Sequence, residues 1–219
     1  HRWLAEVLTA SGQLEEAREE MEMAAQLDSL SLESEIGLAW EAIYARRYDD
    51  AIERCEAILA RSPDSAAALE LLARALALTG RTRDAEARLD QRLQLGETAA
   101  LQLDLAWVKA LSGDREGTQH LLRSLVGGEY GYVPPYRSAL VHLALGEPRE
   151  ALRLLRDAAE ARDYESALVL VDPRIDALRS DLGFQEIVRL SLAPPAEDPA
   201  PTSEAAGDRS GDPEVGGAG

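Results

Sequence analysis

Apolar residues recur at spacings of three and four along most of the chain, and short turn signals interrupt them at nearly constant intervals. The first turn contains Gly12, and equivalent turns follow 34, 34, 33 and 33 residues further along, at Arg46, Gly80, Gly113 and Gly146. Glycine readily adopts the left-handed conformation that ends a helix, and apolar residues three or four apart form one face of a helix. The pattern therefore predicts five pairs of antiparallel helices, each joined by a tight turn.

The segment after the fifth pair does not continue this pattern. Pro173 interrupts the helical spacing, and Ser180 is a suitable N-cap for a last helix with Phe184 on its apolar face. A stack of hairpins needs an atypical end unit that covers its last exposed face. We therefore expect an all-α fold over residues 1–192, an α-solenoid of about five helical hairpins with a C-terminal capping helix. The expected ranges are 1–30, 31–64, 65–97, 98–127 and 133–163 for the repeats and 164–192 for the cap.

Residues 193–219 differ in composition from the rest of the chain. From Pro194 onward the sequence holds five of the ten prolines and a single large aliphatic residue, Val215. Such a segment cannot bury enough apolar surface to offset its chain entropy. We therefore predict a disordered acidic tail that is rich in proline and glycine.

The repeating units carry a family pattern. In the third unit it consists of Leu72, Ala73 and Leu76 in the first helix, Gly80 at the turn and Ala85 in the second helix. These units resemble tetratricopeptide repeats, whose period is 34 residues, and the resemblance implies that the α-solenoid is right-handed. Five such units in phase make the resemblance specific, although each unit alone is a weak match.

The end of the array resembles a narrower group. The strings YVPPY and VDPRIDALRSDLGFQ, which flank the fifth repeat, are similar to the C-terminal tetratricopeptide region of bacterial multidomain signalling proteins with a TolB-like segment. In those proteins the region follows an adenylate-cyclase, serine/threonine-kinase or winged-helix domain. The resemblance implies a partner-binding or scaffolding arm of a signalling protein.

Charge and cysteine content narrow the range of functions. The chain has 23 basic and 40 acidic residues, a net charge of -17, which would repel a nucleic-acid backbone. A single cysteine, Cys55, allows neither an intramolecular disulfide nor a zinc site built from cysteines. No apolar run reaches the roughly 18 residues of a membrane span. We expect no nucleic acid as partner and no membrane insertion within this segment; the compartment stays open, with the cytoplasm favoured.

The sequence offers no set of residues for catalysis. The three histidines are isolated, and no phosphate-binding, nucleophile-elbow or zinc-protease motif occurs. A run of carboxylates such as Glu15 to Glu22 fits a solvated helix face better than a cation site, which needs an oxygen cage with turn geometry. We therefore predict that the protein is not an enzyme, has no catalytic or metal-binding residues and needs no cofactor.

The resemblance implies that the first helices of the hairpins line a concave groove. In the repeat register Arg2 and Glu6 are the inward positions of the first unit, and the two tryptophans of later units share one position. Aromatic anchors beside charged residues are typical of binding hot spots. The residues that we expect to form the partner-binding groove are Ile36, Trp40, Glu70, Arg74, Leu103, Trp107 and Tyr136.

Three interpretations of this groove remain open. Trp40 and Trp107 could pack between neighbouring helices or against a domain upstream, they could recognise a separate protein or peptide, or they could line a small-ligand pocket. Glu70 and Arg74 lie four residues apart, a spacing at which side chains on one helix can pair with each other.

These observations favour a non-enzymatic interaction or scaffolding module that binds a peptide or protein segment in the concave groove. That segment could belong to another domain of the same full-length chain. The alternative is the regulatory arm of a larger signalling enzyme or transcription regulator, whose catalytic or DNA-binding domain lies upstream of residue 1.

Overall fold

The computed structural model of the chain describes residues 1–27, 31–126 and 130–192. All regular secondary structure in these ranges is helical, and consecutive α-helices pack as antiparallel hairpins. The predicted all-α array of hairpins is therefore confirmed; the predicted tail, residues 193–219, lies outside the described residues. The helices are α1 (Arg2–Ala10), α2 (Leu14–Leu27), α3 (Leu32–Tyr44), α4 (Tyr48–Arg61), α5 (Ala66–Leu78), α6 (Thr82–Leu93), α7 (Ala99–Leu111), α8 (Arg115–Val126), α9 (Pro135–Ala144), α10 (Pro148–Glu160) and α11 (Leu182–Leu192), with the 3-10 helices η1 (Tyr164–Leu168) and η2 (Pro173–Leu178) between α10 and α11.

The turns inside the hairpins have the geometry that the sequence predicts. At the third turn Gly80 has φ +80°, and the following backbone N–H, that of Arg81, donates to the carbonyl of Leu76 at 2.8 Å. This arrangement satisfies carbonyl groups that the end of a helix leaves without a partner. Arg46 takes the same left-handed conformation at the second turn, with φ 62°, although a Cβ atom makes it unfavourable.

Small side chains fill the places where the helices approach one another closely. Interiors are packed without voids, so a column of alanines fixes a short distance between neighbouring helices. Cys55 occupies an interior position equivalent to Met21 and Leu89 and is fully buried, and burial raises the pKa of its thiol to about 12. The thiol is therefore held in its unreactive neutral form. The buried alanines that recur at one repeat position are Ala5, Ala39, Ala73, Ala106 and Ala139 in the first helices and Ala17, Ala51, Ala85 and Ala151 in the second helices.

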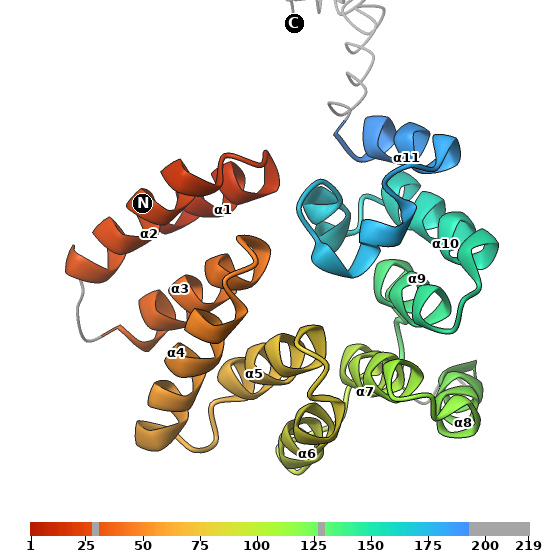
Figure 1. Ribbon diagram of the computed structural model, residues 1–219, viewed down its shortest axis with the longest axis horizontal. Coiled ribbons are helices and arrows are strands. Elements are labelled where there is room, and N and C mark those ends of the chain that lie inside the picture. The colour runs from red at the N-terminus through yellow and green to blue at the C-terminus, as the bar shows by residue number, and fades with distance from the viewer. Residues whose placement is uncertain (28–30, 127–129, 193–219) are drawn as a thin grey trace, which may run out of the picture.

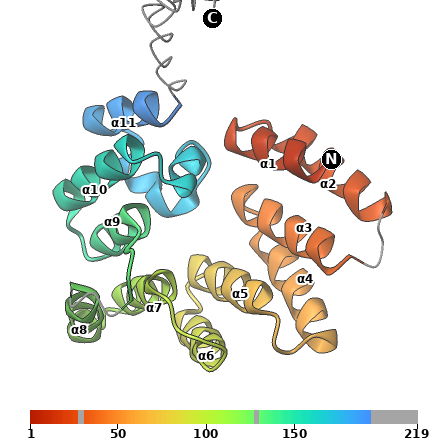
Figure 2. The ribbon, with the colours of Figure 1, turned by 180° about the vertical axis from the view of Figure 1, so that it is seen from behind.

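The hairpins form a curved array whose two ends approach each other (Figure 1). In the third, fourth and fifth hairpins the first helix lies toward the inside of the curve and the second toward the outside, which the view from behind also shows (Figure 2). Helices α1 and α3 line the same inner side together with residues 164–168. The array therefore has a concave surface built from α1, α3, α5, α7 and α9.

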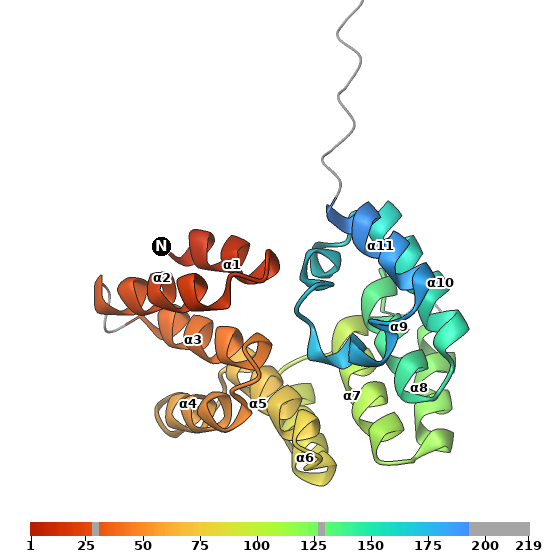
Figure 3. The ribbon, with the colours of Figure 1, turned by 45° about the horizontal axis from the view of Figure 1, so that its top comes forward.

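The C-terminal segment has two parts with different positions. Helix α11 packs against α10, with Phe184 and Ile187 buried, as expected of an end cap. The 3-10 helices η1 and η2 instead run across the concave side of the array, where η1 contacts α1 and η2 contacts α9 (Figure 3). Half of the expected cap thus fills part of the groove.

Candidate functional site

A buried ion pair anchors η2 inside the concave surface. The carboxylate of Asp172 accepts a hydrogen bond from Nη2 of Arg174 at 2.7 Å, and both side chains are almost completely buried. The hydroxyl of Tyr136, on α9, donates to the same carboxylate at 3.1 Å. The guanidinium of Arg174 lies over the ring of Trp107, on α7, with 5.9 Å between its central carbon and the ring centroid. The pair thereby joins two inner helices through one segment.

Two further ion pairs tie the same segment to the array. Arg137, on α9, donates to Glu165 at 2.8 Å and to Asp104, on α7, at 2.9 Å. Arg46, at the turn between α3 and α4, donates two hydrogen bonds to the carboxylate of Asp176, at 2.6 and 2.8 Å. Bidentate pairs of this kind are among the stronger charge-assisted contacts. They connect the C-terminal segment directly to the second and fifth hairpins, and Arg137 links the fifth hairpin to the fourth through Asp104.

The cationic partners decide the ionisation of the buried carboxylates. Burial alone would raise the pKa of Asp172, but the adjacent Arg174 outweighs burial and holds the pKa below its ordinary value. Arg137 and Arg174 likewise lower the pKa of Glu165 although that side chain is largely buried. The segment is therefore fixed by ionised carboxylates in the folded state.

This electrostatic arrangement makes the fold sensitive to acid. Because Asp172 and Glu165 have folded-state pKa values below the ordinary 3.8 and 4.5, the unfolded chain binds more protons than the folded chain at acidic pH. Their stabilisation should be complete above about pH 5 and should be lost progressively below about pH 4. Urea denaturation at a series of pH values measures this loss; a free energy of unfolding that stays constant down to about pH 3 would contradict it.

Three of the predicted groove residues are buried apolar or aromatic side chains. Trp107 is 5% exposed and Tyr136 is 0% exposed because Arg174 and Asp172 cover them. The expectation that these two rings lie open to a partner needs correction, since the chain's own C-terminal segment occupies their surface. Leu103 is also buried and lines a different cavity, with Leu122 and Leu125 of α8.

The remaining predicted residues come together in one cavity. Ile36, Trp40, Glu70 and Arg74 line a space of about 270 Å³ between α3, α5 and η1. A second space of about 140 Å³, between α1, α3 and η1, is lined by Trp3, Glu6 and Val7. Both spaces share Trp40, Tyr164 and Leu168, so we treat them as one surface and call it the open groove.

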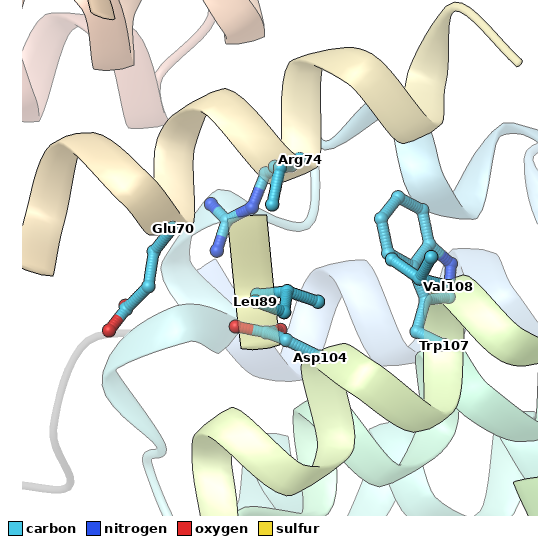
Figure 4. Close-up of a pocket in the computed structure, with 7 residues that line it drawn as sticks. Glu70, Arg74, Leu89, Asp104, Trp107 and Val108 are labelled. Carbon is cyan, nitrogen blue, oxygen red and sulfur yellow. The ribbon is translucent and has the colours of Figure 1, made fainter. Parts of the chain in front are cut away.

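Glu70 and Arg74 do not pair with each other as their spacing allows. The carboxylate of Glu70 accepts a hydrogen bond from Arg92 at 2.7 Å, and Arg74 donates to the hydroxyl of Tyr44 at 3.3 Å. Both side chains extend from α5, across from Asp104 and Trp107 on α7 (Figure 4). The space that these four residues help to line is only about 10 Å³, room for about one water molecule. This space is therefore too small for a peptide side chain or a small-molecule ligand.

The two most exposed aromatic residues of the open groove, Tyr164 and Trp3, were not among those predicted. Tyr164 belongs to the segment expected to be an end cap, so its position in the sequence gave no reason to place it on the concave side. Trp3 stands at the repeat position of Gly37 and Leu71. A Cβ atom at Gly37 would meet Met21, and Leu71 is 7% exposed. The 72% exposure of Trp3 distinguishes it from those equivalents.

Comparisons with known proteins agree with the fold. Two family models, each described as tetratricopeptide repeat, match the chain: one covers residues 42–102 and the other residues 1–23 and 139–157. No curated protein matches. These findings support a tetratricopeptide-repeat protein, and repeats of this kind generally mediate protein–protein interactions; neither model describes a catalytic family. Among the described residues, no helix is long and apolar enough to cross a membrane.

Proposed function

We propose that the chain is a non-enzymatic interaction module that binds a protein or peptide segment in the open groove. The observation that carries this proposal is the continuity of the groove, because two cavities share the side chains of Trp40, Tyr164 and Leu168. A partly exposed Trp40 beside Ile36 offers the aromatic and aliphatic anchoring surface that partner residues bury in hot spots. The groove is a concave surface on a helical scaffold, which suits an extended or helical segment.

The partner segment can belong to a separate protein or to another domain of the same full-length chain. In the second case the array is the regulatory arm of a signalling enzyme or transcription regulator whose catalytic or DNA-binding domain lies upstream of residue 1. The open groove would perform the same recognition in both cases, so one experiment on the groove tests the binding site for both.

Replacing Ile36 with glutamate should weaken binding of partner segments by about tenfold or more, because it places a charge among the apolar anchors of the groove. A library of short random peptides selected on the immobilised full chain supplies the ligands, and fluorescence anisotropy measures their affinity. Leu182→Glu is the matched control, since Leu182 is 77% exposed at the start of α11 and does not line the open groove.

Peptides that bind the Leu182→Glu variant normally and the Ile36→Glu variant weakly would support the proposal. Selected peptides that bind both variants with unchanged affinity would place the recognition surface elsewhere. A library that yields no binder would count against recognition of short segments.

A further inference from the structure

The cavity at the α1 end of the open groove combines aromatic side chains with one carboxylate. Trp3, Trp40 and Tyr164 line it together with Glu6. Trp3 and Tyr164 are 72% and 69% exposed. The ring of Trp40 packs against the ring of Tyr44, with ring centroids 4.6 Å apart and planes tilted by 55°. The cavity therefore has one fixed aromatic wall and two accessible ones.

The carboxylate of Glu6 has no cationic neighbour in the described ranges of the chain, since no arginine, lysine or histidine side chain lies within ion-pairing distance of it. The two basic residues at the start of α1 have other acidic partners: Arg2 pairs with Glu33 at 2.7 Å, and His1 pairs with Glu20. Burial and then the negative charges of Glu6 and Glu165 raise the pKa of the Tyr164 hydroxyl, so both carboxylates lie close enough to act on that side chain. Glu165 is itself paired with Arg137, which leaves Glu6 as the carboxylate available to a ligand.

We propose that this cavity binds the side chain of an arginine in the partner segment. Aromatic faces attract a guanidinium through their quadrupole, and arginine stacks on aromatic rings more readily than lysine does. The carboxylate of Glu6 would supply the counter-charge and hydrogen-bond acceptors. The volume of about 140 Å³ leaves room for one side chain, and the net charge of -17 attracts basic segments over a longer distance.

This inference rests on the proposed function, because the arginine belongs to the partner segment. A small arginine derivative tests the arginine site separately from the binding of peptides. The probe is Nα-acetyl-arginine amide, and the neutral isostere is Nα-acetyl-citrulline amide. In an NMR titration of the full chain with the arginine probe, the indole N–H resonances of Trp3 and Trp40 should shift until the site is saturated. The resonance of Trp107 should not move, because that side chain is 5% exposed and lies under Arg174. Citrulline should cause much smaller shifts, since it keeps the shape and lacks the charge.

Glu6→Gln should weaken binding of the arginine probe by about tenfold, the scale of one lost charge interaction at a partly exposed aromatic site. The matched control is Glu19→Gln, which removes the same charge from an exposed position on α2. Equal binding of arginine and citrulline, an unchanged affinity in Glu6→Gln, or shifts confined to other residues would each overturn the assignment.

The two proposals fail in different ways. If selected peptides depend on Ile36 but show no preference for arginine and bind the Glu6→Gln variant normally, the arginine site is wrong and the proposed function stands. If the arginine probe binds as described while no peptide depends on Ile36, the cation site stands and recognition of segments along the groove is wrong.

Discussion

Replacing Asp172 with alanine should lower the free energy of unfolding by about 3–5 kcal/mol, the range seen when one partner of a buried ion pair is removed. The change leaves the guanidinium of Arg174 buried without its counter-charge and deprives the Tyr136 hydroxyl of its acceptor. It also removes the side-chain cap on the backbone N–H of Arg174, which lies 2.9 Å from the Asp172 carboxylate. Three stabilising contacts depend on this one side chain.

Urea denaturation of the full chain measures the effect of the Asp172 change. Asp157→Ala is the matched control, because Asp157 pairs with Arg153 on the exposed surface of α10. Exposed pairs of this kind contribute about 1 kcal/mol or less. If the two substitutions destabilise the protein equally, the buried pair does not anchor the C-terminal segment as the contacts indicate.

Trp107→Ala should also be strongly destabilising, by about 3–5 kcal/mol, because emptying a buried aromatic site removes packing that the surroundings cannot replace. The indole is 5% exposed and packs beneath Arg174, so the substitution opens a void on both α7 and the C-terminal segment. The expected loss concerns the stability of the fold, and binding in the open groove should persist wherever the variant is folded.

Trp3→Ala provides the comparison for the Trp107 variant. It removes the same side chain from a position that is 72% exposed, where substitutions usually change stability by about 0.5 kcal/mol or less. Chemical denaturation of both variants gives the two free energies. A Trp107 variant as stable as the Trp3 variant would show that the indole is not part of the core.

Local sequence signals were sufficient for the repeating part of the fold. The 33- and 34-residue spacing of the turns depends on residues close together in the chain, such as Gly80 and the helix that it ends, so one sequence reveals it. The inward register of Ile36, Trp40, Glu70 and Arg74 follows from the same period, and these residues do line one cavity. A period identifies which face a residue lies on, so the placement of these four residues on the concave side could be predicted.

The period does not reveal what covers that face. Trp107 and Tyr136 have the register of a groove, but the segment that buries them lies outside the repeat and returns across the concave side. The one sequence feature connected with this contact is Arg46, which alone replaces glycine among the five turns. Its unfavourable left-handed backbone accompanies a bidentate pair with Asp176, a contact between residues too distant in sequence for local patterns to show.

The contact between Arg46 and Asp176 joins residues that are 130 positions apart. In an open stack of repeats each unit contacts only its neighbours, so the units can unfold from the ends in steps. Here the last segment is hydrogen-bonded to the second and fifth hairpins and lies over Trp107 of the fourth. These contacts raise the contact order, so unfolding of one end should destabilise the other. The array is therefore expected to behave as a closed cooperative unit that folds more slowly than an open solenoid of the same length.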